Sequence, residues 1–438
     1  MAGLFAGSGM DASVARRLLD GLLDSQGWSQ AAFAAEQRRR LGAIVGFAHA
    51  EIPFYRSRLA PLFRGDGSIA WDAWADLPIL TRQDLARHAG AMRPSALPPG
   101  HGDTHDFSTS GTTGEPVTVR VSRFANVVSQ CCLFRGQMWN HLDWSGDVLT
   151  WFGDSGPEAE PGVHRRGPWG PPWRPGSTGS LFSIARATPA AEVIDAARRL
   201  RVSYLMGRPR TLQELAAETL RRGETLPLRG LLTFGAETTG DAREACRAAF
   251  GAEMIGGYAS KEAGLLAYDC ATCGKRHINA DTVLVEVVDA RGRPVPPGEV
   301  GRIVVTPLFN FAQPLIRYDQ GDLGVVGTAE AAHTALPVLE RLAGRTTDLF
   351  RLRDGRVLAP SIPESIGESA GAALWQVAQV DEATVEIRYI PAAGRRFDEA
   401  VFSQAIAQYL DPGLRVRFAM TPALGKGQDK FRRYSFEA

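Results

Sequence analysis

The chain has 438 residues, enough for two or three domains around a large hydrophobic core. Its 49 Lys and Arg nearly balance its 48 Asp and Glu, so the net charge of +1 gives no reason to expect a nucleic acid partner. Charged residues interrupt every apolar run before the ~18 residues that a membrane span needs, and no secretory signal pattern is seen. Five cysteines, an odd number at low density, argue against a disulfide framework. We therefore expect a cytoplasmic protein that binds neither nucleic acid nor membranes.

The first hundred residues are predicted to be mainly helical. Apolar residues recur at helical spacing from Asp11 to Asp24 and from Gln30 to His49. From Phe107 onward, short apolar runs alternate with helical patterns, which is typical of an α/β sheet domain. The runs with strand patterns are Val148 to Phe152, Leu231 to Phe234 and Met254 to Ile255, and a helix is expected from Ala242 to Phe250.

The run from Phe107 to Pro116 concentrates hydroxyl side chains and glycines between two predicted strands. Glycines let a backbone curl with its N–H groups pointing inward, and hydroxyls add further donors to an anionic oxygen. No Lys-Ser or Lys-Thr follows the last glycine, and Pro116 opposes an immediate helix, so this is not a Walker loop. The run predicts a phosphate-binding loop of another type, with a polar hairpin turn as the alternative.

Two later segments indicate further layers of the same domain. Residues from Gly153 to Gly179 are dense in Gly, Pro, Arg and Trp, and we expect them to form a lid or a surface excursion. Thr282 to Asp289 and Gly301 to Thr306 are predicted to pair as an antiparallel hairpin. A β-rich layer should therefore follow the α/β core.

The last ~95 residues have strand and helix patterns of their own, enough for a small α+β domain. A strand is expected from Thr384 to Tyr389 and a helix from Phe397 to Leu410. We place a linker near Gly344.

Several segments stand in an order that resembles the acyl-adenylate-forming superfamily, most closely its phenylacetate-CoA ligase branch, nearly end to end. The segments that carry the resemblance are Phe47 to Arg56, Asp76 to Leu85, Phe107 to Pro116, Gly235 to Glu237, Gly257 to Glu262, Arg317 to Asp322, Gly344 to Asp348, Gly355 to Ser361 and Lys430 to Arg433. The resemblance implies an α/β fold with a large N-terminal adenylation domain at residues 1–343, which combines α/β sheets with the β-rich layer and begins with the helical lead-in at 1–100. A hinge at 344–348 and a small, mobile α+β lid domain at 349–438 complete this expectation.

The same resemblance implies a nucleotide site for ATP and Mg²⁺. The residues expected to bind the nucleotide are Ser110, Gly111, Thr112, Thr113, Gly114, Gly235, Ala236, Glu237, Tyr258, Asp322 and Arg345. Those expected to take part in catalysis are Thr112, Glu262 as the Mg²⁺ ligand, and Lys430, whose cation would offset charge at the α-phosphate. Taken one at a time, these residues have plainer alternatives: strand-ending turns, core packing for Tyr258, a solvated helix start for Glu262, and a basic tail or Lys426 in place of Lys430.

Four positions depart from the pattern of the superfamily. They are Lys261, Asp319, Thr347 and Asp429, which stand where relatives usually carry a hydroxyl residue, an Arg, an acidic residue and a Gly. A non-catalytic nucleotide-binding relative is therefore an alternative to the enzyme.

The branch suggests that an aromatic carboxylic acid is activated as acyl-AMP, with release of pyrophosphate, and then passed to CoA. Small or apolar residues are expected to line the acid pocket, namely Gly207, Phe234, Gly256, Gly257 and Ala259. The alternative acceptor is an amine, a hydroxyl or a carrier-protein thiol. The branch also suggests a homodimer.

Cys270, Cys273 and His277 form a C-x₂-C pair with a His four residues later, a spacing that lets three donors converge on Zn²⁺. The resemblance adds that many relatives complete such a site with a later C-P-C loop, which this chain lacks. His333 is our candidate for the fourth ligand of a structural zinc, with water or a carboxylate as substitutes. The alternative is two reduced surface cysteines beside a hydrogen-bonded histidine.

Overall fold

The computed structural model describes most of the chain, and the segments that it describes are 12–109, 117–151, 161–174, 176–327, 334–358, 360, 362–363, 365–392, 394–422, 424 and 433–437. The chain forms two compact units, one of residues 1–320 with 324–341 and one of residues 321–323 with 342–438. The boundary at 341 lies close to the linker predicted near Gly344, while the function of residues 344–348 as a hinge stays a prediction. No helix of the described segments is long and apolar enough to cross a membrane.

The predicted N-terminal helices are confirmed as α2 (Ala12–Ser25) and α3 (Gln30–Glu51). Helix α3 begins where it does because the side chain of Ser29 accepts a hydrogen bond from the backbone N–H of Ala32. Shorter helical elements complete this region: α4 (Pro53–Leu59), η1 (Ala60–Leu62), η2 (Trp71–Asp76) and α5 (Arg82–His88).

The helical lead-in shares a core with the strands of the first unit. Ile44 and Val45 of α3 are fully buried in a cluster with Leu308 and Ile316, and each such side chain contributes about 1.5–3 kcal/mol by leaving water. The hydroxyl of Tyr55 donates to the carbonyl of Pro314 at 2.6 Å in the same core. The lead-in is therefore an integral layer of this unit.

Two antiparallel strands flank the glycine-rich run, as predicted. Strands β1 (Thr104–Thr109) and β2 (Val117–Ser122) pair in a register that sets Thr109 opposite Val117. Helix α6 (Arg123–Trp139) follows at once, capped by the hydroxyl of Ser122. Residues 110–116 connect the paired ends of the two strands and lie outside the described residues.

An eight-stranded sheet of order β10-β9-β8-β7-β6-β3-β5-β4 confirms the predicted α/β core. Its strands are β3 (Val148–Trp151), β4 (Val163–Pro168), β5 (Ser180–Ile184), β6 (Tyr204–Gly207), β7 (Gly230–Thr233), β8 (Met254–Ser260), β9 (Gly264–Cys270) and β10 (Lys275–Ile278). Strands β5, β3, β6, β7 and β8 run parallel to one another, whereas β4 at one edge and the β9-β10 hairpin at the other join antiparallel.

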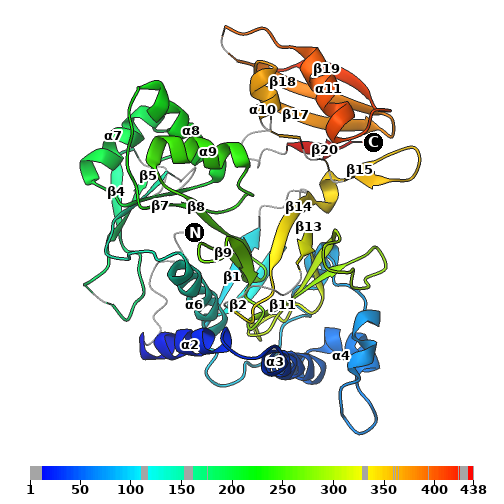
Figure 1. The fold of residues 1–438 in the computed structure, drawn as a ribbon. Coiled ribbons are helices and arrows are strands. Elements are labelled where there is room, and N and C mark those ends of the chain that lie inside the picture. The colour runs from blue at the N-terminus through cyan, green and yellow to red at the C-terminus, as the bar shows by residue number, and fades with distance from the viewer. Residues whose placement is uncertain are drawn as a thin grey trace. The chain divides into compact units, whose positions relative to one another are not determined.

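Three helices, α7 (Ala190–Leu200), α8 (Pro209–Arg221) and α9 (Gly240–Phe250), lie together against this sheet (Figure 1). Their apolar faces share one cluster with the strands, including Val193, Leu212, Leu231, Cys246 and Phe250. Strands β3, β6 and β7 are buried along their whole length, as parallel strands covered by helices require.

The described part of the segment from 153 to 179 differs from the predicted lid. Residues 163–168 form the edge strand β4, paired antiparallel with β5. The indole of Trp169 is buried, and its N–H donates to the carbonyl of Gly146 at 2.7 Å. The tryptophans that suggested a surface excursion thus anchor the segment to the sheet.

The β-rich layer is a second sheet of order β11-β12-β13-β14. Its strands are β11 (Val283–Val288), β12 (Gly301–Pro307), β13 (Tyr318–Val326) and β14 (Leu339–Arg345). The antiparallel pairing of β11 with β12 confirms the predicted hairpin.

The second compact unit has the predicted α+β character. Its main sheet has the order β19-β18-β17-β20. Its elements are η4 (Thr346–Asp348), β15 (Phe350–Arg351), β16 (Val357–Leu358), α10 (Ser365–Ser369), β17 (Ala372–Asp381), β18 (Thr384–Pro391), α11 (Glu399–Tyr409), β19 (Arg415–Met420) and β20 (Tyr434–Phe436). Trp375, Val385 and Phe402 lie in its own buried cluster, so this unit has an independent core.

Candidate active site

The residues expected to line the acid pocket come together on adjacent parallel strands. Gly207 pairs in register with Thr233, and Thr233 with Gly256. Phe234 and Gly257 follow these positions directly in the chain. A Cβ atom on Gly256 would lie 2.2 Å from the hydroxyl of Thr233, so a larger residue at this position would displace the Thr233 side chain. Open α/β sheets bind ligands beyond the carboxyl ends of such strands.

Tyr258 and Ala259 continue strand β8 beyond this point. Tyr258 is 8% exposed and sits opposite Ala267 of β9, and the register shifts between Tyr258 and Ala259. The burial of Tyr258 agrees with the core-packing alternative as well as with an aromatic wall for a purine. Its contact with adenine stays a prediction.

The strand ends are bound together by two residues that the sequence did not single out. Arg276 of β10 donates through Nε to Asp269 at 2.8 Å and through Nη1 to Glu237 at 2.9 Å. The second carboxylate oxygen of Asp269 accepts the backbone N–H of Gly256 at 3.0 Å. Burial alone would lower the pKa of Arg276, but attraction to Asp269 and Glu237 outweighs it and raises that pKa. Neither Asp269 nor Arg276 belongs to a recognisable motif. The only signal in the sequence is that Asp269 directly precedes Cys270 and Arg276 directly precedes His277.

Glu262, the predicted Mg²⁺ ligand, has a cationic neighbour. Nη1 of Arg82 lies 3.4 Å from its carboxylate, whose side chain is 10% exposed. Burial raises the pKa of the nearby Tyr318 phenol, and the Glu262 charge adds to the increase while Arg82 opposes it. A hard cation prefers carboxylate oxygens, so Glu262 fits Mg²⁺, which would compete with Arg82 for it. Arg82 lies in the segment from Asp76 to Leu85 that carries part of the resemblance, but the sequence did not predict its place beside Glu262.

Lys261, which departs from the usual hydroxyl residue, contacts the strand before the glycine-rich run. Its ammonium donates to the carbonyl of Ser108 at 2.7 Å. The substitution therefore replaces a small hydroxyl by a tie to the end of β1. The predicted phosphate-binding residues Ser110 to Gly114 lie outside the described residues, and their grip on a nucleotide stays a prediction.

Asp322 and Arg345, both in the second compact unit, form an ion pair, and their contact with a nucleoside stays a prediction. Nε of Arg345 lies 3.0 Å from the carboxylate of Asp322, and the hydroxyl of Thr346 donates to the carbonyl of Gly321. Gly321 has a φ of +72°, which suits glycine. A ribose diol bound by Asp322 would share its carboxylate with Arg345.

Arg317, the first residue of the segment from Arg317 to Asp322, has a structural role. Arg317 is fully buried with a φ of +52°. Its guanidinium donates to the carbonyls of Ala75, Leu77 and Gly292 at 2.9, 2.8 and 2.7 Å. Arg317 therefore holds the lead-in against the β11-β12 connection.

Asp319, which stands where relatives often carry Arg, also has a defined partner. Its carboxylate accepts from Nη1 of Arg302 at 3.1 Å. The acidic residue is thus accommodated by a cation on the neighbouring strand β12.

The three residues of the predicted metal knuckle converge. The ligand atoms of Cys270, Cys273 and His277 all lie within 4.8 Å of one another, and Sγ of Cys273 is 3.2 Å from Nε2 of His277. Thiolate and imidazole donors at such separations suit Zn²⁺ after a small adjustment. The five cysteines, all within the described residues, form no disulfide.

The fourth predicted ligand, His333, lies outside the described residues. The chain just after it passes beside the knuckle, because Val338 bridges to His277 and the carbonyl of Pro337 accepts from the N–H of Ile278 at 2.8 Å. The placement of His333 as a zinc ligand stays a prediction.

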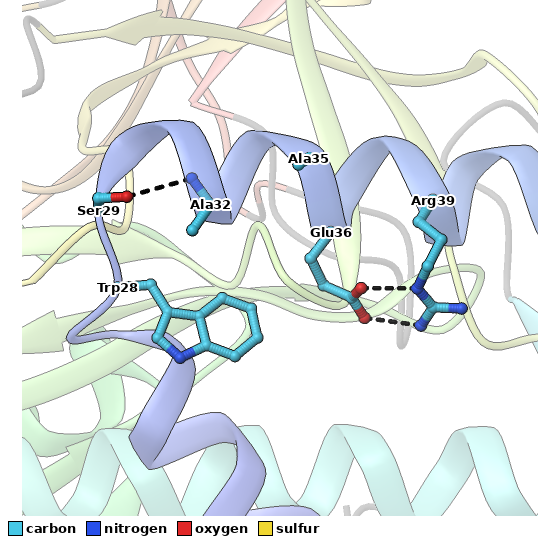
Figure 2. A pocket seen from close by; sticks show the side chains of 6 residues that line it. All are labelled: Trp28, Ser29, Ala32, Ala35, Glu36 and Arg39. Carbon is cyan, nitrogen blue, oxygen red and sulfur yellow. Dashed lines mark hydrogen bonds and ion pairs between the residues drawn. The ribbon is translucent and has the colours of Figure 1, made fainter.

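A shallow hollow elsewhere in the first unit contains none of these residues. Figure 2 shows that α3 and the turn before it form it, and it is lined by Trp28, Ser29, Ala32, Ala35, Glu36 and Arg39. Hydrogen bonds from Arg39, opposed by partial burial and helped by Arg40, lower the pKa of Glu36 to about 2. Its lining is a helix surface with one ion pair, which offers no reactive group.

Comparison with known proteins gives a consistent result. Residues 107–308 match the family model for AMP-binding enzymes. A phenylacetate-coenzyme A ligase of Pseudomonas putida is 26% identical over 354 residues, 76% of this chain and 75% of that protein. A phenylacetate-coenzyme A ligase of Thermus thermophilus is 27% identical over 348 residues, 73% of this chain and 72% of its own length.

Solved structures agree at the level of the fold. A 2-hydroxyisobutyryl-CoA ligase in the postadenylation state superposes with a TM-score of 0.69 at 19% identity, covering 93% of this chain and 90% of that one. An anthranilate CoA ligase in complex with anthranoyl-AMP gives a TM-score of 0.55 at 16% identity, covering 83% of this chain and 74% of its own.

Residues 107–308 thus match AMP-binding enzymes, and the fold and the relatives agree with the resemblance of the chain to the acyl-adenylate-forming superfamily. The relatives that the chain resembles over about three quarters of its length are phenylacetate-CoA ligases, and together with the family match they support an acid–thiol ligase, as the motifs predicted.

Proposed function

We propose that this enzyme activates an aromatic carboxylic acid with MgATP and then transfers the acyl group to CoA. The observation that carries the proposal is the alignment of Gly207, Thr233 and Gly256 on three adjacent parallel strands, with Glu237 held beside them. This arrangement presents a row of small residues next to the predicted purine site. A flat ring fits against such a row.

The first step forms one bond and breaks one. A carboxylate oxygen attacks the α-phosphorus of ATP, and the bond from that phosphorus to the bridging oxygen of pyrophosphate breaks. The chain needs no nucleophile of its own, because its task is to align two anions and to offset their charge. Mg²⁺ held by Glu262 would stabilise the leaving pyrophosphate.

The remaining roles follow the resemblance. Thr112, Thr113 and the loop amides would hold the β- and γ-phosphates, Asp322 and Arg345 the nucleoside, and Lys430 the reacting centre. Lys430 lies outside the described residues, as does its rival Lys426.

In the second step a thiol attacks the acyl carbonyl and AMP leaves. The ligase relatives favour CoA as the acceptor, and product analysis with and without CoA separates it from an amine or a carrier protein. A structural zinc at the knuckle, a homodimer and a cytoplasmic location, in keeping with the reduced cysteines, belong to the same proposal.

Acid-dependent exchange of labelled pyrophosphate into ATP tests the first step. We expect exchange with at least one acid of a panel of phenylacetates, benzoates, hydroxybenzoates and aminobenzoates. Lys430→Ala should lower the exchange rate about 10²–10³-fold while ATP still binds, since one charge at the transition state is lost. Lys426→Ala is the matched control and should leave the rate within a few-fold.

Absence of exchange across the whole panel would contradict the adenylation of an aromatic acid. A normal rate in Lys430→Ala with a loss in Lys426→Ala would transfer the catalytic role to Lys426. For the knuckle, metal analysis of protein purified without chelator should find one zinc per chain, and less than stoichiometric zinc would contradict that part.

A further inference from the structure

We propose that Asp269 and Arg276 couple the Cys-His knuckle to the nucleotide pocket, so that a metal held by Cys270, Cys273 and His277 tightens nucleotide binding. This inference rests on the proposed function, since it assumes that the Gly235 to Glu237 turn contacts the nucleotide. Asp269 and Arg276 are then positioning residues, because they would act on the nucleotide only through Gly256 and Glu237, which they hold in place.

On each strand of the β9-β10 hairpin, a charged residue lies next to a candidate metal ligand. Arg276 pairs with Asp269 across the hairpin, the next pair toward the turn contains Cys270, and the next pair away from it contains His277. Asp269 is thus one peptide from Cys270, and Arg276 is one peptide from His277. Any change in the register or the twist of the hairpin at the knuckle moves both charged side chains.

One of these side chains reaches the segment that follows β7, and the other reaches the backbone of β8. Arg276 binds the carboxylate of Glu237, which lies beyond β7, at 2.9 Å. Asp269 accepts the N–H of Gly256 on β8 at 3.0 Å. One ion pair therefore fixes both the predicted purine turn and the strand that carries Gly256.

The burial of the pair makes this connection stiff. The side chains of Arg276 and Asp269 are 12% and 20% exposed, so water screens their attraction less than at a free surface. A guanidinium that bridges two carboxylates is also held in orientation as well as in position.

The turn between Cys270 and His277 is tied to the end of α6 by two hydrogen bonds: the N–H of Ala271 donates to the side chain of Asn140 at 3.1 Å, and the hydroxyl of Thr272 donates to the carbonyl of Trp139 at 3.4 Å. Residues 271–274 form a tight turn in which Gly274 has a φ of +67°, and Ala271 and Lys275 are exposed. Three donors joined by one ion would remove the local opening of such a turn. Because the pocket binds nucleotide only when Glu237 and Gly256 are in place, a larger closed population raises the apparent affinity.

Arg243 provides a second cation near Asp269. Its Nη2 lies 3.9 Å from the carboxylate, and its Nη1 donates to the carbonyl of Met254 at 2.9 Å. Loss of Arg276 would therefore leave Asp269 with a neighbouring positive charge. We expect Arg276 variants to fold for this reason.

The test measures the affinity of the full-length chain for a non-hydrolysable ATP analogue by calorimetry. Each protein is measured with zinc bound and after removal of zinc by a chelator. The variants are Arg276→Gln, which removes the charge, and Arg276→Lys, which keeps it but lacks the bridging fork. Arg247→Gln breaks an ordinary exposed ion pair with Glu253 in the same unit and is the matched control.

We expect removal of zinc to weaken nucleotide binding of the wild type about tenfold, a common size for coupled sites. Arg276→Gln and Arg276→Lys should weaken binding with zinc present and should respond to the chelator less than twofold. Arg247→Gln should behave as the wild type. By reciprocity, the ATP analogue should tighten zinc binding to the wild type by the same factor and leave zinc binding to Arg276→Gln unchanged.

A zinc response that persists in both Arg276 variants, or is absent from the wild type, would overturn the coupling while the wild type's nucleotide binding upholds the proposed function. Failure of the zinc-loaded wild type to bind the analogue at all would overturn both. If Arg276→Gln does not fold, the zinc response of Arg276→Lys and the zinc titration of the wild type with and without the ATP analogue still test the coupling.

Discussion

Two segments, the Arg317 to Asp322 stretch and the hairpin from Asp269 to His277, each contain an arginine, fully buried in the first and partly buried in the second, and use it in opposite ways. Arg317 belongs to a recognisable nucleotide motif, yet its guanidinium binds the carbonyls of Ala75, Leu77 and Gly292 in the interior. Arg276 belongs to no motif, yet it joins Glu237 to Asp269 at the strand ends. A motif therefore shows which segment of the chain is similar to a known one. The role of an arginine in that segment becomes clear only from the groups that its guanidinium contacts.

The charge of each arginine is offset by nearby carboxylates, to a different degree at the two sites. Arg317 is 0% exposed and also faces Glu286 at 3.3 Å, so its charge is offset by one carboxylate and several carbonyls. Arg276 has two carboxylates and remains 12% exposed. We therefore expect removal of Arg317 to affect folding and removal of Arg276 to affect binding.

The largest effect should come from Arg317→Met. The substitution keeps much of the volume but leaves Glu286 buried without a cation and three carbonyls without their donor, at a cost of about 3–5 kcal/mol. Denaturant unfolding should show this loss, while protein that remains folded should bind nucleotide with the wild-type affinity. A variant of normal stability and weakened nucleotide binding would reverse the contrast between the two arginines.

The double variant Arg317→Met/Glu286→Gln supplies the control, because it removes the buried charge and should recover part of the loss. The pH dependence has a definite sign. Burial raises the pKa of Glu286 and Arg317 lowers it, so without Arg317 that pKa rises further. A carboxyl whose pKa is raised by folding loses stability as pH rises through the folded pKa. The deficit of Arg317→Met should therefore shrink from about pH 8 to about pH 5 and should change less in the double variant.

An intermediate effect is expected at the other end of the same segment. Asp322→Asn removes the charge that faces Arg345 and leaves a single acceptor for a ribose diol. Nucleotide affinity should fall about tenfold, whereas stability should change by less than about 1 kcal/mol because the pair is partly exposed. Calorimetry and denaturant unfolding measure the two quantities.

Asp319→Asn is the comparison for Asp322→Asn. Asp319 lies three residues before Asp322 and forms an ion pair with Arg302. The substitution weakens that pair and should leave nucleotide affinity within twofold. Equal losses of affinity in the two variants would show that Asp322 has no special part in nucleotide binding.

The sequence predicted the fold well where patterns are local. The apolar spacing of Gln30 to His49 matches α3, and the run from Met254 matches the start of β8. It did less well for residues 163–168, whose Gly, Pro and Arg content suggested a loop while pairing with β5 makes them a strand. An edge strand of this kind owes its form to pairing with a neighbouring strand, here 12 to 21 residues further along the chain, and not to its own composition.

The candidate site shows the same division. The convergence of Cys270, Cys273 and His277 follows from spacing within one hairpin and was predicted. The contacts of Arg82 with Glu262 and of Arg276 with Glu237 join residues 180 and 39 positions apart. No local pattern encodes such pairs, because the partner of an isolated arginine is decided by the packing of the sheet.

The smallest effect is expected from Glu237→Gln, which tests the outer arm of the Arg276 bridge. Glu237 is 47% exposed, so its ion pair contributes little to stability, and the free energy of unfolding should change by less than about 0.5 kcal/mol. The amide still accepts a hydrogen bond from Arg276 but without the charge, so the turn should be held less firmly and nucleotide affinity should fall about two- to threefold. Glu253→Gln, which weakens the exposed pair with Arg247, is the matched control and should leave affinity unchanged. Equal nucleotide affinities in Glu237→Gln and Glu253→Gln would mean that the contact of Arg276 with Glu237 does not affect binding. Arg276 would then act only through Asp269 and Gly256.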